Sequence, residues 1–323
     1  PAPLGTARPL GSSSLLAGLF DTLLTTMTIA RTLSGSVEGT VDKNLHVFKG
    51  IPYAEPPEGP HRFQPPRPLE AWKGVREATR PGGVPIQPAM PVLRFMNAGA
   101  SRQSEDCLYL NVWTPGTGRA RRPVFVWIHG GGFLIGAGSS PVYDGGLLAS
   151  NGDMVVVTIN YRLGALGYVH LGGLGIEGLE EASNLGVRDQ IAALEWVRDE
   201  IAVFGGDPDR VTVFGESAGG TNVFSLLLAP PARELFQRAI SESGSLSSVA
   251  RAKAEKLAKG GYPFCDVLYN WDSAEETYGS GDYTDVPVPE CGRCRCGRPG
   301  RLQRQRYRSL CRIRRRSDLA DLS

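Results

Sequence analysis

The sequence predicts an α/β fold in which a mostly parallel central sheet is covered by helices on both faces. Two observations support this prediction. Short apolar runs alternate with helix-like stretches along the chain, and one run leads through a glycine-rich turn directly into a helix-like segment. The apolar runs are nearly continuous rather than alternating, which is typical of strands buried on both faces of a parallel sheet.

Three apolar runs are the clearest strand candidates. They are Val124–Ile128, Met154–Ile159 and Val211–Phe214. Each is short, rich in β-branched or aromatic residues and bounded by turn residues, as expected of a buried strand.

A helix is expected between the second and third of these runs. Ser183 is a candidate N-cap, and the glycines at 205 and 206 with Asp207 and Pro208 end the stretch. Apolar residues spaced three and four apart mark one buried face; they are Ile191, Leu194, Val197, Ile201 and Phe204. Trp196 is expected to pack in this interface rather than to bind substrate.

Composition excludes several classes of protein. The chain has 323 residues, of which 41% are hydrophobic, with 35 Lys and Arg against 33 Asp and Glu. Its 41 Gly and 24 Pro together stay below the ~25–30% that indicates low complexity. No stretch approaches the ~18 uncharged apolar residues of a membrane span. A collagen, a coiled coil, a membrane channel and a wholly disordered chain are therefore excluded.

The two ends differ from the body. In residues 1–26 the apolar run Leu15–Phe20 is cut short by Asp21, so the segment lacks the pattern of a secretory signal. Met27 directly precedes the first patterned segment, and we expect the natural start there. The expected organisation is a disordered leader over 1–26, a folded body over 27–260 and a divergent, disordered tail over 261–323.

The tail carries the basic charge of the chain. Eleven arginines lie between Arg293 and Arg316, with no acidic residue among them. The tail has no apolar periodicity that could build a core, and its Arg, Gly and Cys content resembles coding sequence read in the wrong frame. A truncated or frameshifted gene product is the resulting hypothesis.

Two functional interpretations of the tail remain as alternatives. A zinc site would need two cysteine pairs at suitable spacing, and the tail offers Cys291, Cys294, Cys296 and Cys311. The arginines could instead bind phosphate backbones, although only Tyr307 could provide a stacking platform there. We expect neither a metal nor a nucleic-acid partner.

A serine follows the third strand candidate on a sharp turn. The motif Gly215-Glu216-Ser217-Ala218-Gly219 lies between that strand and a helix-like run to Leu228. Glycines two residues on either side of the serine let backbones crowd together, and such a turn lifts the hydroxyl above the sheet. The start of the next helix offers N–H groups and a positive dipole end to a developing oxyanion. The pattern predicts a nucleophilic serine.

A glycine run directly after the first strand candidate supports this prediction. It reads His129-Gly130-Gly131-Gly132-Phe133, and a run in that position can aim backbone N–H groups at the same oxyanion. The alternative, two unrelated turns in a glycine-rich chain, does not account for the strand and helix that flank the motifs.

With these motifs and four others in the same order, the chain resembles the type-B carboxylesterases. This branch of the α/β-hydrolases includes carboxylesterases, cholinesterases and some lipases. The likeness runs from about residue 30 to 250, and its further motifs are Phe48–Ala54, Ser104–Asn111, Asn160–Gly164 and Phe204–Pro208. The resemblance implies an α/β-hydrolase fold whose C-terminal part is missing, and carboxylic ester hydrolysis through a serine acyl-enzyme.

The resemblance also implies roles for single residues. Ser217 would be the nucleophile, and the buried acid beside it would be Glu216. The oxyanion hole would consist of the N–H groups of Gly131, Gly132 and Ala218. Ser243 would support the catalytic acid of the family.

The chain departs from the family in its base. A serine needs a base that is oriented by an acid, and in this fold both follow the serine in the sequence. The histidines are His46, His61, His129 and His170, and all precede Ser217. None is expected to act as the base, and the downstream acids Glu275, Glu276, Asp282 and Asp285 are expected to be solvated. We therefore expect the catalytic acid and histidine to be absent and the chain to be weakly active or inactive.

The remaining expectations concern partners and location. The reaction needs no cofactor or metal, the substrate would be a small carboxylic ester, short-chain by default, and no membrane partner is expected. Secreted members of the family pair the cysteine matching Cys107 with one upstream, and none precedes it here, which favours a cytoplasmic enzyme. The alternative function is a non-catalytic, hydrolase-like scaffold for binding or adhesion.

Overall fold

The computed structural model describes residues 26–42, 44–88 and 102–245, together with short strands at 248–249, 268–269 and 312–314. The strands are β1 (Thr26–Arg31), β2 (Ser36–Asp42), β3 (Leu45–Pro52), β4 (Val75–Glu77), β5 (Tyr109–Thr114), β6 (Arg122–Ile128), β7 (Val155–Ile159), β8 (Gly206–Glu216), β9 (Arg238–Glu242), β10 (Ser248–Val249), β11 (Leu268–Tyr269) and β12 (Arg312–Arg314). The helices are α2 (Gly146–Gly152), α3 (Gly164–Tyr168), α4 (Leu185–Glu200) and α5 (Ala218–Leu228), with 3₁₀ turns η1 (Gly59–His61), η3 (Pro141–Tyr143), η4 (Gly172–Leu174), η5 (Ile201–Phe204) and η6 (Pro230–Ala232).

One mixed sheet organises this part of the chain. Its strand order is β1-β2-β3-β5-β7-β6-β8-β9-β12, with β4 beside β2. The neighbours from β1 to β7 pair antiparallel, and β7, β6, β8 and β9 are parallel. Short turns join the first three strands, whereas α2, α4 and α5 provide the crossovers that parallel neighbours require. The α/β fold class is confirmed, with an antiparallel N-terminal half.

The three strand candidates lie side by side at the centre of the sheet. Val126 of β6 is opposite Val157 of β7 on one side and Val213 of β8 on the other. All three of these valines have no solvent exposure, as their nearly continuous apolar runs predict. The observed strands β6 and β8 extend beyond the predicted ones at their N-terminal ends, so β8 begins at Gly206.

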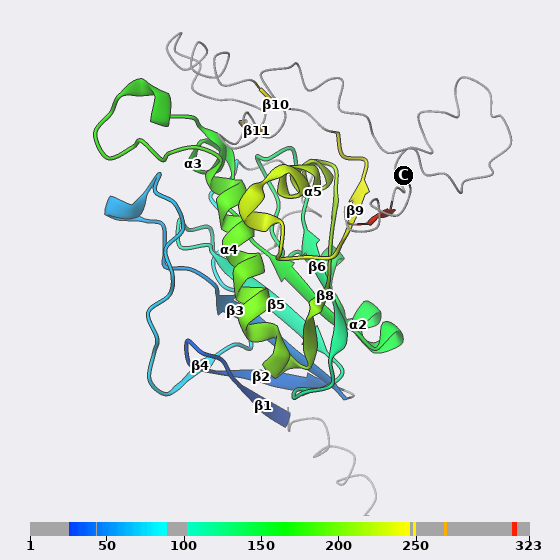
Figure 1. Ribbon diagram of the computed structural model, residues 1–323. Coiled ribbons are helices and arrows are strands. Elements are labelled where there is room, and N and C mark those ends of the chain that lie inside the picture. The colour runs from blue at the N-terminus through cyan, green and yellow to red at the C-terminus, as the bar shows by residue number, and fades with distance from the viewer. Residues whose placement is uncertain are drawn as a thin grey trace, which may run out of the picture.

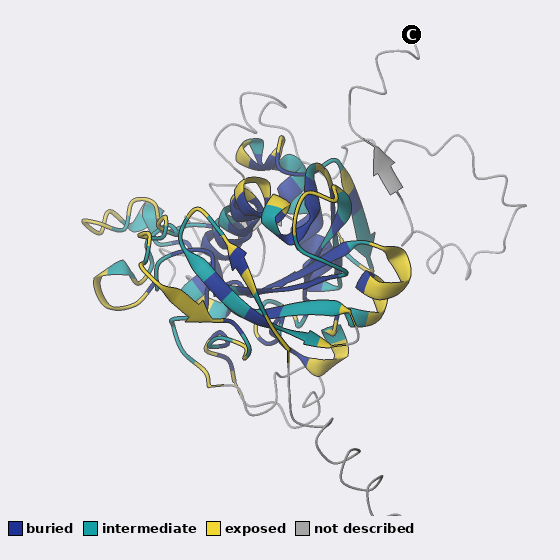
Figure 2. Cartoon of the chain, turned by 90° about the horizontal axis from the view of Figure 1, so that it is seen from below, coloured by how far each residue is buried: buried dark blue, intermediate teal, exposed yellow. Residues whose placement is uncertain are grey.

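Helices cover both faces of the sheet. Val155 and Val157 of β7 belong to the main core with residues of α4 and α5. Val156, which points the other way, packs with Ala149 of α2 and with Trp113. Figure 1 shows α4 and α5 together in front of the strands, and Figure 2 shows buried residues concentrated in the sheet and these helices.

Helix α4 differs from its prediction at both ends. It begins at Leu185 with Asn184 as N-cap in a left-handed conformation (φ 51°). Ser183 precedes this N-cap, and its hydroxyl hydrogen-bonds with His170. The final apolar positions predicted for the helix lie in η5, whose C-cap is Gly205 with φ 80°. Trp196 is buried, and its ring lies 5.7 Å from that of Phe204, which confirms its place in the core.

A buried ion pair ties the loop after β7 to α4. The Arg162 side chain donates through Nε and Nη2 to Asp189 at 2.8 and 2.7 Å, and its backbone N–H donates to the same carboxylate at 2.9 Å. The side chains are 3% and 0% exposed. Arg162 Nη1 also donates to the carbonyl of Gln64 at 2.8 Å, so three segments meet at this guanidinium.

The predictions for residues 1–25 lie outside the described part of the chain. The same holds for the cysteines and acids of the tail that the sequence singled out, and for its arginines other than Arg312 and Arg314, which lie in β12. Among the helices that are described, none has both the length and the apolar character needed to cross a membrane.

Removing the charge of Asp189 should destabilise the fold strongly. Asp189→Asn leaves the Arg162 guanidinium buried without its counter-charge, and we expect the free energy of unfolding to fall by about 3–5 kcal/mol. Urea unfolding followed by circular dichroism measures the change. The matched control is Asp199→Asn, since the Arg198–Asp199 pair is about half exposed and should change stability by less than about 1 kcal/mol. Equal losses in the two variants would contradict this account.

Candidate active site

Ser217 occupies the junction between β8 and α5. Its backbone has φ 55° and ψ −119°, a conformation that residues other than glycine rarely adopt. Two backbone hydrogen bonds hold it there: Ser217 N–H donates to the Glu242 carbonyl at 2.8 Å, and Thr221 N–H donates to the Ser217 carbonyl at 2.9 Å. The side chain is half-buried. The structure thus confirms the strand, turn and helix expected around this serine.

The glycines of the serine turn are required by contact with the neighbouring strand. A Cβ on Gly215 would lie 2.7 Å from the Ile128 carbonyl oxygen and 2.6 Å from the carbonyl carbon of Gly219. A Cβ on Gly219 would overlap the same Ile128 oxygen. Because Ile128 is also the register partner of Gly215, the ends of β6 and β8 are fixed side by side.

This register places the glycine loop against the serine. Gly130 follows β6, and a Cβ built on it would lie 3.3 Å from Ser217 Cβ and 2.6 Å from the Glu216 carbonyl oxygen. The loop then turns through Gly131 (φ 112°) and Gly132 (φ 62°). The N–H groups of Leu134 and Ile135 both donate to the Gly131 carbonyl at 3.1 Å, which closes the turn.

Three residues near Ser217 have backbone N–H groups without a helix or loop acceptor in the part of the chain that the structure describes. Ala218 is the first residue of α5, and the first N–H groups of a helix have no acceptor within the helix. Within the described residues, the N–H groups of Gly131 and Gly132 donate to no protein oxygen. The structure therefore brings the three expected oxyanion-hole residues to the same corner of the sheet as the serine.

Glu216 adds a carboxyl group to this corner. Burial, and next the negative charge of Glu242, raises the pKa of Glu216. A Cβ on Gly130 would lie 3.1 Å from Glu216 Oε2, so the carboxyl lies against the glycine loop. Burial and the charge of Glu216 also raise the pKa of Tyr143.

His129 supports the glycine loop from below. Its Nδ1–H donates to the Gly130 carbonyl at 2.8 Å, and its ring stacks on Tyr161 with centroids 4.4 Å apart. Tyr161 donates its hydroxyl proton to the His129 carbonyl at 2.6 Å. Burial lowers the pKa of His129 to about 4, against the raising effect of its hydrogen bond to Gly130. The ring is neutral at pH 7, and its Nδ1–H is used in the hydrogen bond to Gly130.

The other three histidines have partners elsewhere. His46 hydrogen-bonds with Thr28, His61 with Arg67, and His170 with Ser183. In the described part of the chain no histidine hydrogen-bonds with Ser217. The structure thus brings no imidazole base to the serine from these residues.

Ser243 lies just past β9 with φ 54° and is exposed. It is Ser241, two residues earlier, that contacts the start of α5, by donating its hydroxyl to the Gly220 carbonyl at 3.0 Å. A Cβ on Gly220 would lie 2.8 Å from the Glu242 carbonyl oxygen. The sequence prediction did not include Ser241, whose sole signal is its proximity to Ser243.

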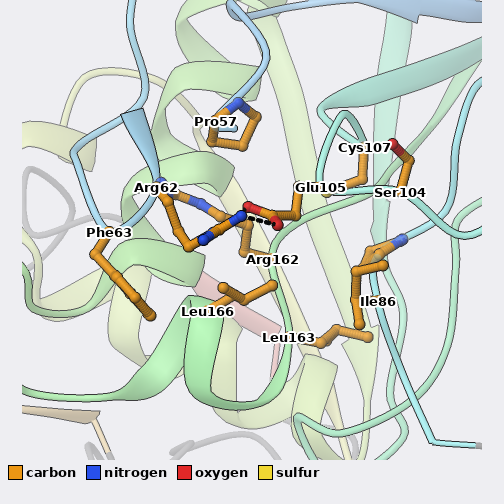
Figure 3. A pocket seen from close by; sticks show the side chains of 11 residues that line it. Pro57, Arg62, Phe63, Ile86, Ser104, Glu105, Cys107, Arg162, Leu163 and Leu166 are labelled. Atoms are coloured by element: carbon orange, nitrogen blue, oxygen red, sulfur yellow. Dashed lines mark hydrogen bonds and ion pairs between the residues drawn. The ribbon is translucent and has the colours of Figure 1, made fainter. Parts of the chain in front are cut away.

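The lining of a small pocket includes none of the expected site residues. Figure 3 shows Arg62 and Glu105 paired across it, with Leu163 and Leu166 on one side. The Arg62–Glu105 hydrogen bonds measure 2.7 and 2.6 Å. The cavity holds about 10 Å³, about the space of one water molecule, and so is too small for an ester.

Cys107 lines this pocket as a free, buried thiol. Burial, and next the charge of Asp189, raises the pKa of Cys107 well above its usual value, so the thiol stays protonated and unreactive. Among the described residues no three His, Cys, Asp or Glu side chains come close enough together to hold a metal ion.

The geometry has a counterpart in known proteins. The Carboxylesterase family matches residues 26–261, which is more than half of the chain. The chain belongs to this family. The match begins at β1 and covers the glycine loop, the serine turn and β9, so every element that builds the corner described above lies within it.

Relatives of this carboxylesterase-family chain include esterases from bacteria and mammals. It is 50% identical over 240 residues to the para-nitrobenzyl esterase of Bacillus subtilis, covering 74% of this chain and 48% of that protein. It is 47% identical over 235 residues to rabbit (Oryctolagus cuniculus) liver carboxylesterase 1, covering 69% of this chain and 40% of that protein. The chain thus spans about half the length of the curated relatives it matches.

Solved structures agree with the fold. A PNB esterase superposes with a TM-score of 0.65 at 49% identity, covering 72% of this chain and 47% of that one. The carboxylesterase EST55 of Geobacillus stearothermophilus, at pH 6.2, superposes with a TM-score of 0.66 at 44% identity, covering 80% and 51%. Both comparisons confirm the α/β-hydrolase fold for the matched part of the chain.

Acid should weaken the fold through His129. Its pKa is about 4 in the folded chain and about 6.5 when unfolded, so the unfolded state binds the proton more tightly. Stability is then fully present above pH 6.5 and declines as the pH falls towards 4, by about 3 kcal/mol from this residue. Urea unfolding at pH 7 and pH 4.5 measures the loss. In His129→Gln, which cannot titrate, the difference between the two pH values should be smaller; an unchanged difference would show that His129 does not carry the effect.

Proposed function

We propose that this chain supplies the nucleophile and the oxyanion hole of a serine carboxylic ester hydrolase. One observation carries the proposal: the strained Ser217 turn lies directly against the Gly130–Gly132 loop. Esterase relatives that are 50% and 47% identical in sequence to this chain support the same reaction class. The substrate class is a small carboxylic ester, and the chemistry needs neither a metal nor a cofactor.

The proposed reaction proceeds through an acyl-enzyme. Ser217 Oγ attacks the ester carbonyl carbon and loses its proton to a base, while the carbonyl oxygen takes the negative charge. The N–H groups of Gly131, Gly132 and Ala218 would hold that oxyanion. The carbon–oxygen bond to the alcohol then breaks and the alcohol leaves with a proton. Water attacks the acyl-enzyme in turn, which releases the acid and restores the serine.

Glu216 and Ser243 keep supporting roles in this proposal. The Glu216 carboxyl, whose pKa is raised by burial and by Glu242, would shape the electrostatic field at the glycine loop. Ser243, just past the end of β9, would support the catalytic acid of the family.

The rate of ester hydrolysis by this chain would be limited by the lack of a histidine base that could accept the Ser217 proton. None of its four histidines follows Ser217, and the only one next to the loop, His129, is buried and committed to Gly130. A site that retains an oxyanion hole without a complete triad still accelerates hydrolysis by roughly 10³–10⁴ over water. We therefore propose slow turnover for these 323 residues.

A fluorophosphonate probe should label Ser217. In that reaction Oγ forms a bond to phosphorus, fluoride leaves, and the phosphoryl oxygen occupies the place of the ester oxyanion. We expect one adduct per chain by intact mass, slow at pH 7 and faster at pH 9, located on Ser217 by peptide mapping.

Two variants decide the outcome. Ser217→Ala should abolish labelling. Ser225→Ala removes a hydroxyl from α5, the helix that follows Ser217, and should leave labelling unchanged. Absence of any adduct on a folded wild-type chain would support a non-catalytic scaffold for binding and would end the esterase proposal for this chain.

A further inference from the structure

The Gln87 side chain forms two hydrogen bonds with the backbone of a single residue, Gly136, in the loop that continues from the glycine run. Gln87 Nε2 donates to the Gly136 carbonyl at 3.0 Å, and Gly136 N–H donates to Gln87 Oε1 at 2.9 Å. Gln87 is only 8% exposed. A side-chain amide therefore takes the place of a neighbouring strand beside a loop that has left the sheet.

Gly136 is the residue at which the loop returns to its own start. Its φ is 116°, and a Cβ built on it would lie 2.6 Å from the Gly130 carbonyl oxygen and overlap the ring of His129. The preceding residue, Ile135, donates its N–H to the Gly131 carbonyl at 3.1 Å. Holding Gly136 in place therefore holds the turn that carries Gly131 and Gly132.

The other contacts of the loop lie elsewhere along it. Gly164 N–H donates to the Phe133 carbonyl at 2.7 Å, and Gly138 N–H donates to Asn160 Oδ1 at 2.8 Å. Gly136 itself is buried, so removal of the Gln87 amide would leave a buried N–H and a buried carbonyl without their partner. Leaving such groups unpaired costs more than an average hydrogen bond contributes.

Gln87 is in turn fixed by its surroundings. Its Nε2 also donates to the Pro85 carbonyl at 3.1 Å, and its backbone N–H donates to Gln103 Oε1 at 3.1 Å. The first bond helps to orient the side-chain amide, and the second holds the backbone from which it extends. A side chain that is itself held in one orientation can hold its loop partner in one position.

We propose that Gln87 is a positioning residue for ester hydrolysis: its amide locks Gly136 so that the Gly131 and Gly132 N–H groups face the oxygen of the reacting group. The proposal rests on the proposed function, because it assigns those N–H groups to the oxyanion. Misplacing such donors slows the chemical step and leaves binding of the ground state intact.

The test compares Gln87→Met with a matched control in the full chain. Methionine has nearly the shape of glutamine but cannot form the pair with Gly136. Gln64→Met is the control, because Gln64 also bridges two loops by donating its side-chain amide to a carbonyl, that of Gly178, and does not contact the glycine loop. The measured quantities are the maximal rate and the half-saturating concentration for fluorophosphonate labelling of Ser217.

We expect the maximal labelling rate of Gln87→Met to fall on the order of tenfold, with a half-saturating concentration within about twofold of the wild type. Gln64→Met should keep both values. A merely structural role for Gln87 would lower thermal stability without changing the maximal labelling rate of the folded protein, and that result would overturn the proposal.

A second variant gives a signature that depends on the proton. In Gln87→Glu the neutral carboxyl can donate to the Gly136 carbonyl and accept from its N–H, but its single proton cannot also serve the Pro85 carbonyl. The ionised carboxylate loses the donor and repels the carbonyl oxygen. Burial raises the pKa of such a carboxyl above its usual ~4.3, so labelling relative to the wild type should be higher at pH 5 than at pH 8. A ratio that does not change with pH would contradict the proposal.

Hydrogen exchange separates this proposal from the proposed function. Peptides covering residues 130–138 should exchange faster in Gln87→Met than in the wild type or in Gln64→Met, while peptides of β6 and β8 should not change. If the wild type is not labelled at all, the proposed function fails, and loop exchange alone decides whether Gln87 holds the loop. Unchanged exchange of this loop would overturn the role of Gln87 whatever the labelling result.

Discussion

The carbonyl of Ile128 lies so close to Gly219 that no side chain fits between the end of β6 and the start of α5. This contact has two consequences. It brings the residues after β6 and those after β8 to the same corner, and it requires glycine at 215 and 219. Ser217, between those two glycines, has a positive φ of 55°. Such strain persists only where the surroundings determine the conformation, and here hydrogen bonds with Glu242 and Thr221 do so.

Polar groups buried behind this corner hold the loops that the sheet does not. The Arg162–Asp189 pair joins the loop after β7 to α4, His129 and Tyr161 support the beginning of the glycine loop, and Gln87 pairs with its end. Each side chain satisfies backbone groups that would otherwise be buried without partners, and such groups destabilise a fold strongly. The positions of the loops at the site therefore depend on these buried polar contacts.

The sequence predicted the central strands and the turn at Ser217, because local rules determine both. The runs around Val126, Val157 and Val213 are apolar enough to specify buried strands, and the spacing of Gly215, Ser217 and Gly219 specifies the turn. The hydrogen bond of Ser183 and the role of Gln87 depend on contacts with distant segments, to which His170 and Gly136 belong. No periodicity or motif in a single sequence records such contacts. The catalytic roles assigned from the sequence stay predictions; they concern Ser217, Gly131, Gly132, Ala218, Glu216 and Ser243.

The most direct test of the account is a crystal structure of the chain phosphonylated at Ser217. The account predicts that Ser217 retains its positive φ and that the phosphoryl oxygen lies about 2.7–3.1 Å from backbone nitrogens of the glycine loop and of Ala218. A phosphoryl oxygen directed to solvent, or a serine that has relaxed into the first turn of α5, would contradict it.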